Sequence, residues 1–515
     1  MTQSQNAPAT ALGTRHLARA QLEQADDLRR QGQLDRAESL CFELTRRYPD
    51  YIAALHTLGL IHVDRGNFQR ALDCLVRAQM LDPGNGIILT ALGLTYMRLG
   101  ARDMAARTLD HALAGGFDDA SMFASLGEVY RDGHDYKRAE EAYRNALKRD
   151  HDLESSKIGL ALCLSAVGRY AEAAGVLQDA FRQGHCSLSL LDAIASLPQN
   201  NVSIDLVSAL DLLATKQRTQ DPPLRNTFAF VRVAALHKAG RYSQAWDHLE
   251  AANHALSAQH KAQLKEDIAR QERSLARLRA QPRQPAVTGD NPLTLFILGP
   301  SRSGKSSLEL LLGSLDGVAA AYEAPIVYAA LRRAYQAAAL PAGGDLDQLP
   351  SELQASYRDH YVEELARHIG SARVLTSALS DHIHHVSAIA PQIPNVRFVL
   401  MRRNPRDTAL RIYMSKYLRG NAYAYDLKSI ADYLAWYDAM IGLVAEKHAE
   451  TSLVVTYDDM IADPNAVRDQ VAGLVGLSVG HAPTPDLVDD RDVAKPYDAL
   501  MASFFAVARS ERPGV

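Results

Sequence analysis

Small residues recur along the first half of the chain with a period of 34 residues. Glycines lie five and twelve residues before a repeated alanine, and large apolar residues at helical spacing fill the positions between them. The repeated alanines are Ala37, Ala71, Ala105, Ala139 and Ala173. This pattern predicts pairs of antiparallel helices, which cross closely at the small residues and turn at the glycines.

The period and the small positions resemble the tetratricopeptide repeat, over residues 18–280 as a whole and most strongly over 18–185. The polar stretch 254–280 predicts a long capping helix, which repeat arrays need. Three prolines in 281–292 predict a linker, and residues 1–17 predict a polar tail. Such an array forms a concave groove, so we expect it to bind a protein or peptide. A homodimer contact or a spacer is the alternative.

The pattern after the predicted linker indicates a strand, a loop and a helix. Residues 293–298 are almost continuously apolar, 299–307 are rich in small residues, and leucines follow at helical spacing. Backbone N–H groups at the start of such a helix favour an anion. The loop matches G-x-x-x-x-G-K-[ST], which predicts phosphate binding. Its candidate phosphate-contacting residues are Arg302, Ser303, Gly304, Lys305, Ser306 and Ser307.

Composition and charge exclude several classes of protein. The chain has 515 residues, 47% of them hydrophobic, which excludes a mainly disordered chain and a disulfide scaffold. Its 56 basic and 60 acidic residues give a net charge of -4, so no nucleic-acid partner is expected. The start is polar, and no apolar run reaches the ~18 residues of a membrane span. We therefore expect a soluble, cytoplasmic protein.

The same loop also resembles the P-R-S-G-T-[ST]-L loop of sulfotransferases, although Lys305 replaces the usual threonine. These enzymes use 3′-phosphoadenosine 5′-phosphosulfate (PAPS), and the loop holds its 5′-phosphosulfate. Residues 396–417 resemble the family's strand followed by R-D-P-R-D-x-x-L-S-x-Y, which holds the 3′-phosphate. The resemblance implies that Arg403 binds this phosphate. Arg411 replaces a serine that normally helps, and an arginine offers a fork of donors for the same task.

Further sulfotransferase-like features follow from the same resemblance. Residues 451–477 resemble the family's Y-E-D-L-x-x-D-P stretch, which implies that Tyr457 lies near the nucleotide; a core tyrosine is the alternative. The family's catalytic glutamate falls at Glu323, and Arg302 and Lys305 are the candidate catalytic cations. Two departures count against activity. Ala378 stands where the family often carries a lysine, and 481–515 lacks the family's G-x-W-x-x-Y segment, which closes over the nucleotide.

Asp381 and three nearby histidines form a separate cluster that suggests a metal site. The histidines are His382, His384 and His385. Their spacing fits no familiar zinc pattern, and sulfuryl transfer requires no metal. We therefore expect no metal here and predict surface histidines along the edge of a helix.

The chain as a whole resembles the bacterial tetratricopeptide-repeat sulfotransferases, relatives of the tyrosylprotein sulfotransferases. We predict an all-α repeat solenoid, then an α/β P-loop-like sulfotransferase domain with a mainly parallel sheet over 293–480, and a divergent tail over 481–515. The predicted function is PAPS-dependent sulfation of a hydroxyl on a protein, peptide or glycoconjugate. A P-loop NTPase or kinase using ATP or GTP, with Asp458 and Asp459 ending an apolar run, is one alternative. A catalytically inactive repeat scaffold is the other.

Overall fold

The structure is a computed structural model in which the contacts divide the chain into two units, 1–166 and 167–515. The described residues are 7–216, 222–283, 292–321, 324–340, 346, 349–393, 395–417, 420–479 and 484–502.

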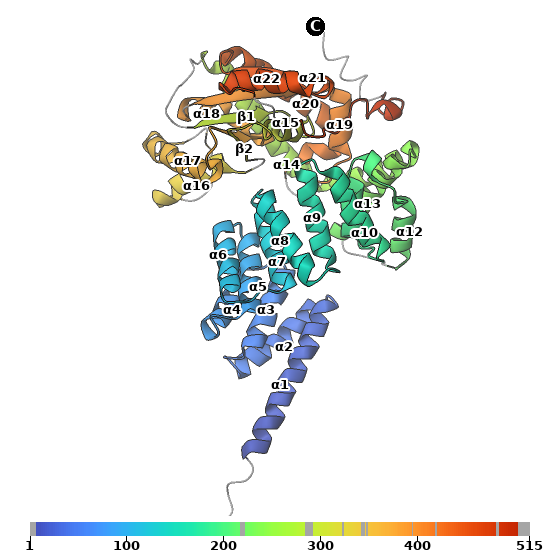
Figure 1. Ribbon diagram of the computed structural model, residues 1–515, viewed down its shortest axis with the longest axis vertical. Helices are drawn as coiled ribbons and strands as arrows, with labels where there is room; N and C mark the ends of the chain where they lie inside the picture. Colours follow the sequence, from blue (N-terminus) through green and yellow to red (C-terminus); the bar gives the residue numbers. More distant parts are fainter. Residues whose placement is uncertain are drawn as a thin grey trace, which may run out of the picture. The chain divides into compact units, whose positions relative to one another are not determined.

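The described part of the first unit consists of helices joined by short turns (Figure 1). These are α1 (Ala7–Arg30), α2 (Leu34–Arg47), α3 (Ile52–Asp64), α4 (Phe68–Leu81), α5 (Gly86–Arg98), α6 (Arg102–Ala114), α7 (Ala120–Asp132), α8 (Tyr136–Arg149) and α9 (Glu154–Ala166). Consecutive helices pack against each other in pairs, α3 with α4 and α5 with α6 among them. The first helix begins inside the stretch expected to be a polar tail, because alanines there favour a helix and no proline lies beyond its second position.

The small residues of the repeat lie where the helices cross and turn. A Cβ atom on Gly59 of α3 would lie only 2.7 Å from Cγ of Leu75 on α4, so a larger residue would separate the two helices. Gly66 adopts a φ of +74° in the turn between them, which suits glycine. The repeated alanines of this unit are fully buried, at Ala37, Ala71, Ala105 and Ala139. The predicted helix pairs are confirmed.

Helices of the repeat type continue into the second unit, and the last of them packs against helices that accompany the sheet. They are α10 (Tyr170–Arg182), α11 (Leu188–Ser196), α12 (Leu206–Lys216), α13 (Pro222–Lys238) and α14 (Tyr242–Ala280). The predicted capping helix is the second part of α14, a continuous helix of 39 residues. The buried amide of Asn253 on α14 donates a 2.8 Å hydrogen bond to the carbonyl of Tyr413, and the indole of Trp436 donates to the carbonyl of Gln271. Most of the predicted linker, 284–291, lies outside the described residues.

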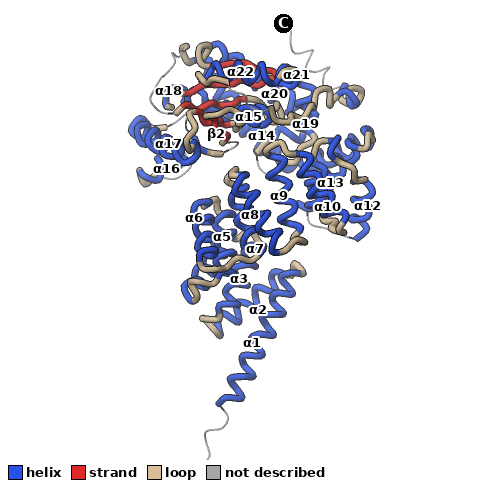
Figure 2. Tube along the Cα trace, in the orientation of Figure 1, coloured by secondary structure: helices blue, strands red, loops and turns tan. Residues whose placement is uncertain are grey.

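Five parallel strands form one sheet in the order β2-β3-β1-β4-β5. The strands are red in Figure 2. They are β1 (Leu293–Leu298), β2 (Val318–Ala320), β3 (Val374–Ser377), β4 (Val396–Arg402) and β5 (Ser452–Thr456). The accompanying α-helices are α15 (Lys305–Leu312), α16 (Ile326–Ala337), α17 (Gln354–Ile369), α18 (Val386–Gln392), α19 (Pro405–Tyr413), α20 (Leu427–Lys447), α21 (Tyr457–Ala462) and α22 (Pro464–Val475). This architecture confirms the predicted α/β fold with a parallel sheet.

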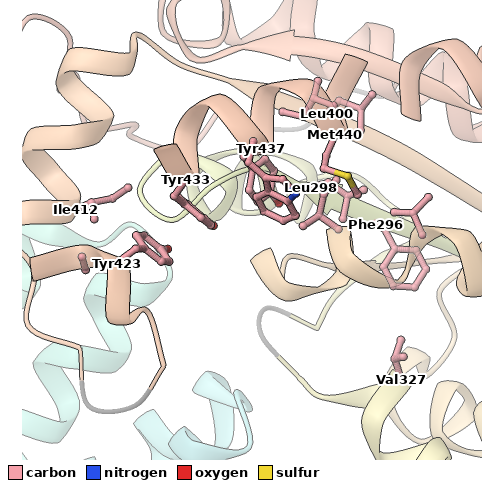
Figure 3. Packing of buried hydrophobic residues seen from close by; sticks show 14 of the residues in the cluster. Phe296, Leu298, Val327, Leu400, Ile412, Tyr423, Tyr433, Tyr437 and Met440 are labelled. Carbon is pink, nitrogen blue, oxygen red and sulfur yellow. The ribbon is translucent and has the colours of Figure 1, made fainter. Parts of the chain in front are cut away.

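Both faces of the sheet are buried at the central strand β1, which explains its continuous apolar run. Leu295 and Ile297 pack in the core that includes α15 and α22. Phe296 and Leu298 alternate with them and pack on the opposite face, in the core that includes Tyr437 of α20 (Figure 3). Because all strands are parallel, their carboxyl ends meet at one edge. The loops after β1 and β4 leave that edge side by side, where the chain order of the strands reverses, and ligands bind at such a position in open α/β sheets.

Candidate functional site

The loop between β1 and α15, residues 299–304, has the conformation of an anion-binding turn and is called the phosphate loop below. Arg302 and Gly304 have left-handed φ values of +65° and +96°. A Cβ atom on Gly304 would lie 2.4 Å from Cδ2 of Tyr457, so both backbone angle and space require glycine there. The first turn of α15 then begins at Lys305, and its N–H groups lie at the carboxyl edge of the sheet.

The hydroxyl of Ser303 is a buried polar atom without a partner in the described part of the chain. Its side chain is fully buried, and Oγ makes no hydrogen bond there. A Cβ atom on Gly299 would lie 2.5 Å from this oxygen, so the loop closes tightly around it. A buried hydroxyl without a partner is costly, and an anion in the phosphate loop would supply the missing acceptor. This residue therefore fits the predicted phosphate site.

Lys305 joins the phosphate loop to the end of β3. Its buried ammonium donates hydrogen bonds to the carbonyls of Gly299 and Pro300, both at 2.9 Å, and to Oγ of Ser380 at 2.8 Å. Ser380 opens the short helix that follows β3. Hydrogen bonds from a charged donor are stronger than neutral ones, so this lysine fixes the two loops to each other.

Tyr437 of α20 supports the phosphate loop from the other face of the sheet. Its hydroxyl accepts a 3.0 Å hydrogen bond from the N–H of Gly299 and donates one of 3.1 Å to the carbonyl of Ser380. Burial raises the pKa of this phenol well above its ordinary value, so it stays a neutral donor. Its role at the loop was missed because its partners lie 57 and 138 residues away.

Arg403 follows β4 and lies between the phosphate loop and the residue after β5. Its guanidinium donates a 3.0 Å hydrogen bond to the carbonyl of Arg302. The guanidinium carbon lies 4.2 Å from the ring centroid of Tyr457, a cation–π distance. The side chain is only 5% exposed. Three segments singled out in the sequence thus meet at one place.

Tyr457 is the first residue of α21 and is buried, so it is both a core residue and a wall of the site. Its hydroxyl donates a 2.6 Å hydrogen bond to the carbonyl of Val488 and accepts one from the N–H of Asp490. Burial raises the pKa of Tyr457 to about 12, although the positive charge of Arg403 opposes this shift.

Residues 484–502, called the C-terminal segment below, lie against the predicted 3′-phosphate residues. The carboxylate of Asp490 forms an ion pair with Arg411 of α19. The N–H groups of Asp492 and Ala494 donate to the carboxylate of Asp407, at 3.0 and 2.9 Å. Sequence reasoning missed these contacts. The only local signal was the run of acids around Asp490, and such a run is usually solvated.

The remaining predicted site residues surround the start of α15 or lie outside the described residues. Arg302 and Ser306 are exposed, and Ser307 is half-buried, all next to the phosphate loop. Glu323, the predicted catalytic glutamate, lies outside the described residues. The structure also shows a carboxylate that the sequence did not single out. Glu309 on α15 is buried and accepts a hydrogen bond from Thr376 of β3.

The predicted surface histidines are buried, and that prediction was wrong. Helix α14 contacts this segment, a contact that no local pattern reveals. Arg270 of α14 binds Asp381 through two hydrogen bonds, at 2.6 and 2.8 Å. The ring of His384 stacks on Trp436, with the ring centroids 4.6 Å apart. The buried residues are His382, His384 and His385. Their neighbours are protein side chains rather than solvent.

The described residues contain neither a metal-binding group nor a membrane-spanning helix. Within the described ranges, no three His, Cys, Asp or Glu side chains are grouped to hold a metal ion. None of the helices described above combines the length and apolar character that crossing a bilayer demands.

Comparison with known families gives a match within the second half of the chain. Residues 292–480 match the model of the sulfotransferase family. This part is therefore a sulfotransferase-family domain, and the resemblance of its three motif segments to sulfotransferases is confirmed at the level of the family.

The chain is also similar to parts of other proteins. Lipopolysaccharide assembly protein B of Escherichia coli K12 is 26% identical over 298 residues, which cover 56% of this chain and 69% of that protein. Human superkiller complex protein 3 is 34% identical over 142 residues, 26% of this chain and 9% of that protein. A solved tetratricopeptide repeat protein from Parabacteroides merdae is 18% identical with a TM-score of 0.35, and the match covers 46% of this chain and 91% of that one.

Proposed function

We propose that this chain is a sulfotransferase that moves a sulfuryl group from PAPS to a hydroxyl of a protein, peptide or glycoconjugate. One observation carries the proposal. Arg403, the phosphate loop and Tyr457 meet at the carboxyl edge of a parallel sheet, in a domain of the sulfotransferase family. The loop suits a 5′-phosphosulfate, and Arg403 with Arg411 suits a separate 3′-phosphate.

The residues of the loop divide the work of binding and charge stabilisation. Bound PAPS would supply an activated phosphosulfate. Backbone N–H groups, Ser303, Ser306 and Ser307 would donate to its oxygens, while Lys305 and Arg302 offset negative charge on the leaving phosphate. The acceptor oxygen forms its bond to sulfur as the sulfur–oxygen bond to the phosphate breaks. Its proton passes to a base, for which Glu323 is our candidate, and adenosine 3′,5′-bisphosphate (PAP) leaves.

Lys305 can supply the positive charge that the family often takes from a lysine at the position of Ala378. Ala378, which stands in that lysine's place, is buried just beyond the end of β3. Two residues further on, Ser380 receives the ammonium of Lys305. The ammonium of Lys305 on the phosphate loop side therefore lies near the end of β3, where the family's lysine would lie. This supports a catalytic domain rather than an inactive scaffold.

The rival NTPase function needs a carboxylate that binds magnesium at the end of β5. Asp459 instead takes part in the N-terminal cap of α21, where the hydroxyl of Thr456 accepts a hydrogen bond from the N–H of Asp459 and donates one to its carboxylate. Asp458 is exposed on the same helix. The side chain that reaches the phosphate loop from this strand end is Tyr457. This arrangement favours sulfuryl transfer over magnesium-dependent hydrolysis of a triphosphate.

For the repeats we propose recruitment of a protein or peptide, either the acceptor itself or a second copy of the chain. Large apolar side chains are exposed on the first unit, notably Phe42, Met80 and Ile87. Exposed apolar residues are common at protein-binding surfaces. We propose the cytoplasm as the compartment, because all four cysteines are free thiols, as a reducing environment favours.

A transfer assay with radiolabelled PAPS tests the proposal. The acceptors would be tyrosine peptides, serine and threonine peptides, and oligosaccharides, and the enzymes wild type, Glu323→Gln and Lys305→Ala. Lys428→Ala is the matched control, because Lys428 is an exposed lysine that pairs with Asp432 on α20. We expect label transfer by wild type and the control only. Equal transfer by Lys305→Ala would exclude the proposed role of that residue, and PAPS binding without transfer to any acceptor would support the inactive scaffold.

A further inference from the structure

The carboxylate of Asp490 lies between the two arginines that the proposed function assigns to the 3′-phosphate. One of its oxygens pairs with Nη2 of Arg411, and the other lies 3.7 Å from Nη2 of Arg403. The same nitrogen of Arg403 donates a 2.6 Å hydrogen bond to the backbone carbonyl of Asp490. The carboxylate of Asp490 therefore occupies the position that the proposed function assigns to the 3′-phosphate of the donor.

The backbone around Asp490 is held in place on both sides. Its own N–H donates to the hydroxyl of Tyr457, and the N–H groups of Asp492 and Ala494 bind Asp407. Further along, the fully buried ring of Tyr497 stacks on His237 of α13, with its hydroxyl 3.0 Å from Nδ1 of that histidine. Asp490 is thus presented to the arginines by an anchored segment.

Arg403 and Arg411 each have a hydrogen-bond donor that Asp490 does not satisfy. The Nε atoms of Arg403 and Arg411 are both buried, and neither has a hydrogen-bond partner among the described residues. A carboxylate offers two oxygens, whereas a phosphate offers three oxygens and more charge. A phosphate in this position would satisfy donors that Asp490 leaves without a partner.

We propose that Asp490 competes with the donor's 3′-phosphate and thereby sets how strongly the site selects a 3′-phosphorylated nucleotide. This inference rests on the proposed function, because that function places the 3′-phosphate on Arg403 and Arg411. Two anions cannot share the arginine pair without strong repulsion, so a 3′-phosphate binds only when the carboxylate of Asp490 leaves it. A nucleotide with a free 3′-hydroxyl binds without that displacement.

The neighbouring Asp489 provides a matched control. It is exposed, and its carboxylate binds Arg491 at 2.6 and 2.9 Å. Arg491 is itself partly exposed in the same segment. Asp489→Asn therefore removes the same charge one residue away and leaves the contacts of Asp490 with Arg403 and Arg411 in place.

Calorimetric titration of the full chain with PAP and with 5′-AMP tests the inference. Asp490→Asn should bind PAP about tenfold more tightly than wild type, because the competing charge is removed. Its affinity for 5′-AMP should change less than twofold. Asp489→Asn should match wild type for both ligands. Asp490→Glu keeps the charge and should keep weak PAP binding. In an Arg403→Ala background, Asp490→Asn should give no gain.

The failure of this inference is distinct from the failure of the proposed function. If wild type binds PAP and a folded Asp490→Asn binds it equally or more weakly, Asp490 supports the site and the inference is overturned, while the function stands. If neither form binds PAP but both bind ATP, the proposed donor is wrong and the inference falls with it. Should Asp490→Asn fail to fold, Asp490→Ser in the same titrations applies the same criteria.

Discussion

The ammonium of Lys305 lies 2.8 Å from Oγ of Ser380 and so links the first residue of α15 to the short helix that follows β3. The link spans 75 residues of sequence. Lys305 therefore places a positive charge where the phosphate loop meets the residues that follow β3. In the proposed reaction the leaving phosphate lies on this side of the sheet edge. Lys305 is therefore the central cation of the proposed reaction.

Removing this charge should abolish transfer while leaving part of the nucleotide affinity. We expect Lys305→Ala to lower kcat/KM for sulfuryl transfer at least about 100-fold, since preorganised charge at a developing anion has effects of this size. Ser380→Ala, which keeps the charge and removes only its anchor, should lose about tenfold or less. Steady-state rates with labelled PAPS provide the measurement. If the two variants lose activity equally, Lys305 acts by holding the loops together.

Arg403 should contribute to binding through the 3′-phosphate specifically. We expect Arg403→Ala to weaken PAP binding about tenfold to 100-fold, the range of a charge-assisted hydrogen-bond pair, and 5′-AMP binding far less. Arg402→Ala is the control, because Arg402 is more exposed and pairs with Asp438. Calorimetry with both nucleotides measures the difference. Equal losses for PAP and 5′-AMP would show that Arg403 only stabilises the loop.

Gly304 should tolerate no side chain. Alanine there meets Tyr457 and must adopt a φ of +96°, so Gly304→Ala should cost about 1–3 kcal/mol in unfolding free energy and prevent nucleotide binding. Gly473 in α22 has open space around its Cβ position, and alanine favours a helix. Gly473→Ala should therefore be neutral or slightly stabilising. Chemical denaturation measures both, and a neutral Gly304→Ala would contradict the described loop.

His382 should make the protein less stable in acid. The ring is fully buried, neither nitrogen has a partner among the described residues, and burial lowers its pKa to about 3. Between pH 6.5 and pH 3 the unfolded state therefore binds a proton that the folded state does not. This residue's contribution to stability accordingly falls as the pH falls through that window.

His382→Leu should stay within about 1 kcal/mol of wild type at pH 7.5, because the buried nitrogens make no hydrogen bonds there to lose. On acidification its unfolding free energy should fall less steeply than that of wild type. His254→Leu, at an exposed position of α14, should keep the wild-type slope. Denaturation at a series of pH values tests this, and parallel curves for wild type and His382→Leu would contradict it.

Features encoded in short stretches of sequence were predicted well. Ala71 and its counterparts recur because every repeat must cross closely at one point, and Gly59 marks a contact with Leu75 that admits no side chain. The apolar run of β1 and the glycines after it likewise predict a buried strand followed by a turn. In each case the physical constraint acts within one helix pair or one strand–loop–helix unit, so the local pattern carries it.

Features that depend on distant segments were not predictable in this way. His382 is buried within the core that α14 helps to form, and Tyr437 binds a loop 138 residues earlier in the chain. Asp490 meets Arg411 across 79 residues, although its own neighbours suggest a solvated acidic stretch. Helix α14 itself was predicted as a cap on the repeats, and the structure shows that it also packs on α20. These contacts follow from tertiary packing, which the spacing of residues along one segment does not encode.

The most direct test of the central claim is calorimetry of the wild-type chain with PAP, ATP and GTP, each with and without magnesium. The proposed sulfotransferase site predicts that PAP binds without magnesium and that neither triphosphate is hydrolysed. Binding of ATP or GTP alone, with magnesium-dependent hydrolysis that Lys305→Ala abolishes, would contradict it.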